Sequence, residues 1–275
     1  MVVCAHGFSG NARDFDFLAA ELSRDARVIC PDVAGRGESA WLPSPLAYHF
    51  PQYLADFRSL LSHVGARDVH WVGTSMGGLL GMLIASEPAS PVRSLVMNDV
   101  GAFLPADALV RIARNLAAPA RFASRHEGEA HIRATHRDWG EISGRQWAHL
   151  VRHGLRRAED GYRLHYDPQI TRTLQPVPFA PGLFFWSAWY RVAVPVLLVR
   201  GERSEVFPPS VAAAMLASNP RARRVEIEDA GHAPALMSAR EMREVHEFLA
   251  EAAPDRRSPT AARRAKMGNR AWNPS

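Results

Sequence analysis

The run G-T-S-M-G at residues 73–77 constrains the fold of this chain more than any other feature. It follows a short apolar run of strand character at 69–72 and precedes an apolar, helix-like stretch at 78–85. A serine between glycines, where a strand turns sharply into a helix, forms a nucleophile elbow. The glycines are needed because a Cβ at either position would collide with neighbouring elements. The elbow holds Ser75 at a helix amino terminus, where N–H groups face developing negative charge.

Alternating strand and helix patterns predict an α/β fold. Six short apolar runs have strand character, and helical patterns separate most of them. The strand-like runs lie at residues 1–5, 27–30, 69–72, 94–98, 194–199 and 224–228. Strands that alternate with helices form a mostly parallel, doubly wound sheet covered on both faces. In such sheets, reactive groups gather at the carboxyl ends of the strands.

A long insertion breaks this alternation. It contains three helical patterns and no clear strand. The helical patterns lie at 106–117, 128–139 and 144–158. A mainly helical insertion between two strands of a sheet predicts a cap over the site. We therefore expect a core of residues 1–102 and 191–253, and a cap of residues 103–190.

An aromatic cluster stands near the end of the predicted cap. Its members are Phe184, Phe185, Trp186 and Trp189. These side chains either line an apolar pocket or anchor the cap on the core.

The basic charge of the chain is concentrated at its carboxyl terminus. The formal net charge is +5, and residues 254–275 contain six basic residues against one acidic residue. Residues 1–253 are therefore formally neutral, which argues against a specific nucleic-acid site in the folded part. The basic tail has no apolar periodicity, so we expect it to be disordered and solvated.

The sequence has neither an apolar membrane span nor a signal peptide, and it contains two cysteines. No apolar run approaches the roughly 18 residues of a membrane span, and the amino terminus lacks the charged and apolar regions of a signal peptide. These features predict a cytoplasmic protein. Cys4 and Cys30 both lie in apolar strand-like runs, which favours small buried hydrophobes over a disulfide or a metal site.

His232 is the predicted catalytic base. A serine hydroxyl needs a base within hydrogen-bond reach and a carboxylate that orients the base. In chains with this elbow the order is nucleophile, acid, histidine. His232 follows the last predicted strand, whereas the other histidines lie on helices, in the cap or before the elbow.

Glu205 is the preferred orienting carboxylate. It lies in the run G-E-R-S-E at 201–205, which follows the predicted strand at 194–199. Asp99, which follows the strand at 94–98, is the alternative acid; its other possible role is to hold the loop between core and cap.

The oxyanion hole requires two N–H donors aimed at the carbonyl oxygen of the substrate. Met76, directly after the serine, supplies one donor. The loop after the first strand, H-G-F at residues 6–8, places the amide of Phe8 nearby as the second donor. His6 is expected to have a structural role in this loop rather than to act as a second base.

Taken together, these motifs resemble the α/β-hydrolase fold superfamily, in particular serine esterase-like members with a helical cap. The matching segments lie at residues 6–8, 31–39, 73–78, 95–101 and 231–234. The resemblance implies hydrolysis of a small or medium carboxylic ester through an acyl-enzyme, with no metal or organic cofactor.

Two departures from the family pattern lead to expectations of their own. Members usually carry Asp where this chain has Glu205, so the extra methylene must be absorbed locally. Members also have two strands before the His-Gly loop, whereas this chain begins within the third. The amino-terminal edge strands are therefore expected to be missing, which would leave the strand at 27–30 unpaired.

The sequence leaves alternatives to ester hydrolysis open. The same triad can hydrolyse a carbon–carbon bond in a vinylogous diketone, a lactone or an amide. A ligand receptor that keeps the pocket but does not turn over substrate is the alternative outside enzymes.

Overall fold

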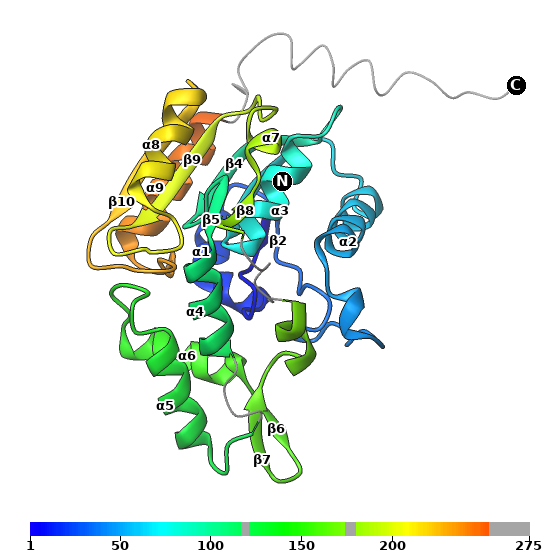
Figure 1. Ribbon diagram of the computed structural model, residues 1–275, viewed down its shortest axis with the longest axis vertical. Coiled ribbons are helices and arrows are strands. Elements are labelled where there is room, and N and C mark those ends of the chain that lie inside the picture. Colours follow the sequence, from blue (N-terminus) through cyan, green and yellow to red (C-terminus); the bar gives the residue numbers. More distant parts are fainter. Residues whose placement is uncertain (117–120, 174–179, 253–275) are drawn as a thin grey trace, which may run out of the picture.

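The computed structural model describes residues 1–116, 121–173 and 180–252, and a six-stranded parallel sheet lies at its centre (Figure 1). The strands have the order β10-β9-β4-β3-β1-β2, and each neighbouring pair is parallel. Their bounds are β1 (Val2–Ala5), β2 (Val28–Ile29), β3 (Val69–Thr74), β4 (Val92–Asn98), β9 (Val196–Gly201) and β10 (Ala222–Ile227). This arrangement confirms the predicted α/β fold.

Helices bury both faces of the sheet. Their bounds are α1 (Asp16–Leu22), α2 (Phe50–His63), α3 (Met76–Ala85), α8 (Pro209–Ser218) and α9 (Ala239–Ala252). Consecutive residues of a strand point to opposite faces, as β3 illustrates. Val72 packs in the cluster formed with α1 and α9, whereas Trp71 packs in the cluster formed with α2, α3 and α8. Because both faces are covered, the inner strands read as mainly apolar runs, whereas the edge strand β10 has the sequence A-R-R-V-E-I.

Strand β2 lies at one edge of the sheet. Val28 pairs with Val2, and Ile29 pairs with Val3 of β1. The expectation that the strand at 27–30 is unpaired is therefore wrong for the side of β2 that faces β1. On its outer side, no strand among the residues that the structure describes pairs with β2.

The insertion between β4 and β9 contains the three expected helices. They are α4 (Ala106–Leu116), α5 (Arg125–Thr135) and α6 (Gly144–Gly154). In Figure 1 these helices gather on one side of the sheet, together with a small hairpin. The division of the chain into a core and a cap at residues 103 and 190 stays a prediction.

The insertion also contains strands, so the expectation of no clear strand is wrong. The hairpin joins β6 (Leu155–Ala158) to β7 (Gly161–Leu164), and β5 (Phe103–Pro105) pairs with β8 (Gly182–Phe184). The predicted helix at 144–158 ends at Gly154, because the next four residues pair with β7 through a turn that requires φ +130° at Gly161. These strands have three or four residues, too few to show an alternating pattern.

Trp189 of the aromatic cluster anchors the chain on the core, whereas Phe184 is 61% exposed. Trp189, in the short helix α7 (Trp186–Trp189), is fully buried, and its Nε1 donates a hydrogen bond to Ser218 in α8 at 3.0 Å. The predicted tail at 254–275 lies outside the described residues. Within the described ranges, no helix is long and apolar enough to cross a membrane.

Candidate active site

Ser75 stands at a strained turn between β3 and α3. Its φ is +50° and its ψ is −115°, a conformation that non-glycine residues rarely adopt. The turn is closed by the glycines on either side: a Cβ at Gly73 would overlap the backbone of Gly77, and a Cβ at Gly77 would overlap the carbonyl oxygen of Ala5 in β1. Both glycines of the motif are therefore required by steric contacts. The turn places Ser75 at the carboxyl end of the sheet.

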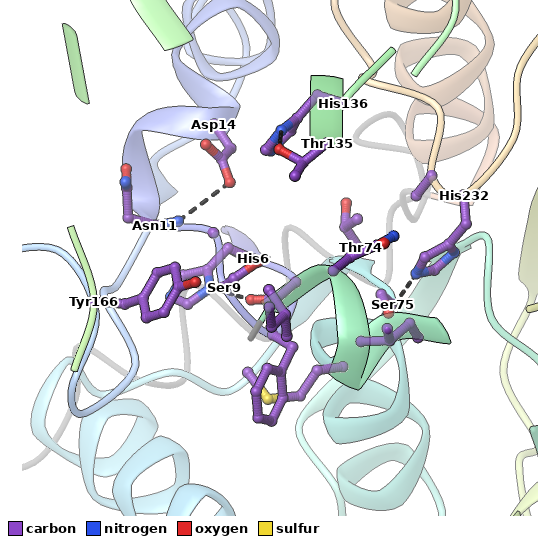
Figure 2. A pocket seen from close by; sticks show the side chains of 18 of the residues that line it. His6, Ser9, Asn11, Asp14, Thr74, Ser75, Thr135, His136, Tyr166 and His232 are labelled. Atoms are coloured by element: carbon purple, nitrogen blue, oxygen red, sulfur yellow. Dashed lines mark hydrogen bonds between the residues drawn. The ribbon is translucent and has the colours of Figure 1, made fainter. Parts of the chain in front are cut away.

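Ser75 and His232 lie within hydrogen-bond distance of each other. His232 follows β10, and its Nε2 is 3.0 Å from Ser75 Oγ (Figure 2). The other ring nitrogen, Nδ1, is 2.7 Å from Oδ2 of Asp99, a fully buried carboxylate that follows β4. The structure thus brings together a hydroxyl, an imidazole and a carboxylate from three strand ends, in the order that proton transfer requires.

Several bonds fix the position of Asp99. Its backbone has φ +55° and donates to the carbonyl of Val199 in the neighbouring strand β9 at 2.8 Å. Oδ1 accepts the N–H of Gly201 at 2.9 Å, and Oδ2 accepts the hydroxyl of Ser204 at 2.5 Å in addition to the imidazole. Both carboxylate oxygens are thereby satisfied by the segment that follows β9.

The structure does not bring Glu205 to the imidazole, contrary to the expectation from the sequence. Its side chain is 66% exposed and forms an ion pair with Nε of Arg111 in α4 at 2.7 Å. The physical reason is visible one residue earlier, because the hydroxyl of Ser204 faces inward to Asp99 and the next side chain points to solvent. The alternative acid of the sequence analysis, Asp99, occupies the position beside His232.

The backbone N–H groups of Phe8 and Met76 are available beside Ser75. Neither amide donates to any group that the structure describes, and both residues line the same cavity as the serine. The loop that carries Phe8 passes close to the elbow, since a Cβ at Gly7 would lie 3.8 Å from the Cβ of Ser75. Two free donors near the serine are what an oxyanion hole needs.

His6 has a structural position rather than a reactive one. Its Nε2 accepts the N–H of Val33 at 3.0 Å, and its Nδ1 is 2.7 Å from the carbonyl of Gly7. Burial lowers the pKa of His6 to about 4. The ring is therefore neutral at pH 7 and both of its nitrogens are occupied.

The sequence analysis missed Arg36, which supports the Phe8 loop. This residue is fully buried, its Nε donates to the carbonyl of Phe8 at 2.8 Å, and its guanidinium lies 4.9 Å and 5.0 Å from the ring centroids of Phe8 and Tyr53. Its only signal in the sequence is its place in the run at 31–39, one of the segments that match the family pattern. Arg36 thus holds the carbonyl oxygen of Phe8, the residue whose N–H is the expected oxyanion donor.

A cavity of about 370 Å³ opens over Ser75 between the sheet and the insertion. Most of its wall is apolar. The larger apolar lining residues include Phe8, Phe50, Leu79, Leu104, Leu109, Ile112, Leu150, Leu164 and Leu183. The four residues of the aromatic cluster are not among the described residues that line it. A concave, mainly apolar site with a few polar groups suits a small organic substrate.

The insertion also holds the loop that carries His232. The N–H of Gly231 donates to the carbonyl of Asp138 at 2.5 Å, and the N–H of Ala235 donates to the carbonyl of Trp139 at 3.0 Å. The residues on both sides of the imidazole are therefore fixed by the segment between α5 and α6.

One cluster in the described part of the chain has the spacing of metal ligands. Asp16, His149 and His153 offer atoms within 4.8 Å of one another. Two of them are already paired with Arg13, because the Asp16 carboxylate binds its guanidinium at 2.7 Å and His149 Nε2 lies 2.9 Å from its carbonyl. None of the three residues touches the Ser75–His232–Asp99 chain.

Comparison with known proteins places this arrangement in a family. The model of the alpha/beta hydrolase family matches residues 2–247. A 3-hydroxybutyrate-oligomer hydrolase from Cupriavidus necator is 41% identical over 242 residues, which cover 85% of this chain and 83% of that protein.

Two solved structures are similar over most of the chain. An alpha/beta hydrolase from Novosphingobium aromaticivorans has a TM-score of 0.82 and 31% identity, with 92% of this chain and 89% of that chain covered. A Rickettsia typhi protein has a TM-score of 0.85 and 29% identity, with 91% and 86% covered.

Proposed function

Because this chain belongs to the alpha/beta hydrolase family and is a hydrolase, we propose that Ser75, His232 and Asp99 form a catalytic triad that cleaves carboxylic esters through an acyl-enzyme. The observation that carries the proposal is the unbroken series of contacts from Oδ2 of Asp99 through the imidazole to Oγ of Ser75, at 2.7 Å and 3.0 Å. A carboxylate, an imidazole and a hydroxyl in this geometry can move a proton and form a covalent intermediate.

Each group has a defined task in the proposed reaction. Ser75 Oγ attacks the ester carbonyl while its proton passes to His232 Nε2, and the N–H groups of Phe8 and Met76 hold the resulting oxyanion. Collapse of the tetrahedral species expels the alcohol, which takes the proton from His232. A water molecule then attacks the acyl-enzyme and gives a proton to the imidazole; collapse of the second tetrahedral species returns that proton to Ser75 Oγ and releases the acid.

Asp99 keeps the imidazole in the productive tautomer. Its carboxylate accepts a hydrogen bond from the N–H at Nδ1, so that Nε2 is free to receive the serine proton. It also stabilises the imidazolium that forms. Because the carboxylate also accepts bonds from Gly201 and Ser204, its orientation is set before substrate binds.

We propose that the substrates are short linear esters of a hydroxy acid. The support for this class is the 41% identical relative, which is named a 3-hydroxybutyrate-oligomer hydrolase. A mainly apolar cavity of about 370 Å³ is compatible with an aliphatic acyl chain.

Covalent labelling combined with an ester panel tests the function. We expect a fluorophosphonate probe to label the wild-type protein, and p-nitrophenyl butyrate and the 3-hydroxybutyrate dimer to be hydrolysed. Ser75→Ala should abolish labelling and lower kcat by about 10⁴-fold or more. Ser9→Ala, which removes another serine of the cavity wall, is the matched control and should keep both activities. Labelling or turnover that survives in Ser75→Ala would contradict the proposal.

A further inference from the structure

The wall of the cavity becomes polar where the loop before α1 meets the end of α5. Asp14 lies in the short 3₁₀ helix η1 (Ala12–Phe15), and Thr135 and His136 lie at the carboxyl end of α5. All three line the cavity, and Figure 2 shows Asp14 and the Thr135–His136 pair at the same end of it. The proposed catalytic steps use none of these side chains.

Asp14 presents one carboxylate oxygen to this end of the cavity. Oδ2 accepts the N–H of Asn11 at 3.1 Å, whereas no donor among the described residues is bonded to Oδ1. A Cβ at Gly10 would overlap Oδ2, so the carboxyl group lies directly against the loop. Burial raises the pKa of Asp14 to about 7, which agrees with a carboxyl group that faces the cavity rather than bulk water.

His136 offers a second acceptor. Its Nδ1 lies 2.8 Å from the hydroxyl oxygen of Thr135 and 2.9 Å from the carbonyl of Ile132. Because a carbonyl only accepts, we assign the proton to Nδ1. Burial lowers the pKa of His136 to about 4, so the ring is neutral and Nε2 is an unprotonated acceptor. The hydroxyl of Thr135 is within 3.0 Å and 3.1 Å of the carbonyls of His131 and Ile132, and its proton is committed to them.

Above pH 7, where Asp14 is mostly ionised, both groups accept hydrogen bonds, and a site lined by acceptors selects a ligand that brings a donor. From the acceptors of Asp14 and His136 we propose that this end of the cavity binds the hydroxyl group of a hydroxyacyl substrate. The subsite rests on the proposed ester hydrolysis and accounts for the choice of hydroxy-acid esters. A hydroxyl fits better than an ammonium group, because the surrounding wall is apolar. The free-energy cost of removing a cation from water would exceed what its interaction with one carboxyl group recovers.

Two matched substrates test the subsite. One is the methyl ester of the 3-hydroxybutyrate dimer, and the other is the same dimer ester with its terminal hydroxyl capped as a methyl ether. The two differ only in the hydroxyl proton and one methyl group. We expect wild-type kcat/KM to be about 10- to 100-fold higher for the free hydroxyl, the range for a buried hydrogen bond to a charged or strongly polar group.

Two variants locate the effect. In Asp14→Asn the amide oxygen still accepts the N–H of Asn11, which turns the NH₂ group toward the cavity and replaces an acceptor with a donor. We expect the ratio of kcat/KM between free and capped dimers to fall to within about threefold of unity. His136→Phe should lower the same ratio without touching the η1 loop, which keeps the test available if Asp14→Asn folds poorly. Asn115→Ala, a change elsewhere on the cavity wall, should leave the ratio at its wild-type value.

The outcomes separate the subsite from the catalytic proposal. Equal hydrolysis of both dimers by the wild type, or an unchanged ratio in Asp14→Asn and His136→Phe, would overturn the subsite and leave ester hydrolysis intact. Failure of all esters together with an unlabelled Ser75 would instead reject the proposed function. A ratio that falls equally in Asn115→Ala would also overturn the subsite, because the effect would then not depend on the acceptors.

Discussion

Replacement of Asp99 by Asn separates the acid that the structure places beside His232 from the acid that the sequence favours. The carboxylate accepts the N–H of Gly201 on Oδ1 and both the Ser204 hydroxyl and the His232 imidazole on Oδ2. Asparagine has nearly the same shape, but one of its two positions carries an NH₂ group. If the amide oxygen faces His232, the NH₂ group faces the N–H of Gly201; if the amide is turned the other way, the NH₂ group faces His232 Nδ1.

The expected magnitude follows from these two orientations. If the amide oxygen stays with Gly201, the NH₂ group faces His232 Nδ1 and favours the tautomer protonated on Nε2, which cannot accept the Ser75 proton. In a serine protease triad, the Asp→Asn substitution lowers kcat by about 10⁴-fold for this reason. We expect kcat to fall by about 10³- to 10⁴-fold here, or about 4 to 5.5 kcal/mol of transition-state stabilisation.

Glu205→Gln is the matched control. The Glu205 side chain is 66% exposed and its partner is Arg111, and an exposed pair of this kind contributes only about 0 to 1 kcal/mol to stability. We expect its kcat for p-nitrophenyl butyrate to stay within about twofold of wild type, with both variants checked for folding by circular dichroism. The assignment of Asp99 is refuted if Asp99→Asn keeps more than a tenth of the wild-type kcat, or if Glu205→Gln loses as much.

Two further predictions concern stability. Gly77→Ala should lower the melting temperature by well over 10 °C or prevent folding, because the new Cβ would overlap a carbonyl oxygen of β1; Gly144→Ala, where nothing lies within 4 Å of the added Cβ, should match or slightly exceed wild type. The urea midpoint should fall as the pH drops from 6.5 toward 4, because His6 and His136, with pKa values of about 4, take up protons there only when the chain unfolds. Asp14, with a pKa of about 7, takes up its proton in the folded state over pH 7 to 4 and opposes this fall, so Asp14→Asn should steepen it; a shallower dependence in the variant would contradict the assignment.

The elbow could be predicted from sequence because its requirements are local. The collisions that exclude a side chain at Gly73 and Gly77 arise from elements adjacent in the chain or in the sheet, so the glycines mark the turn directly. The parallel sheet followed for a similar reason, since strands buried on both faces leave continuous apolar runs. The membership in the α/β-hydrolase superfamily expected from these motifs is confirmed by the match over residues 2–247.

The acid could not be chosen from sequence because two carboxylates follow adjacent strands. Strands β4 and β9 are neighbours, so Asp99 and Glu205 both emerge at the same edge of the sheet. The choice depends on which backbone turns its side chain inward. Asp99 does so through a left-handed backbone conformation, whereas the chain after β9 turns Ser204 inward in place of its neighbour. Such directions are set by tertiary contacts and leave no periodic signal.

The sequence predicts that the insertion covers the site, but it does not predict that the insertion holds the loop of His232, because backbone groups make those contacts. A cap that merely covered the cavity would need no bonds to the base, yet the carbonyls of Asp138 and Trp139 accept the N–H groups of Gly231 and Ala235 on either side of His232. Both carbonyls lie within three residues of His136, one of the acceptors of the proposed hydroxyl subsite. One short segment therefore contacts the substrate cavity at its start and fixes the loop of the proposed base at its end. The position of the imidazole therefore depends on hydrogen bonds to the insertion as well as on its attachment to β10.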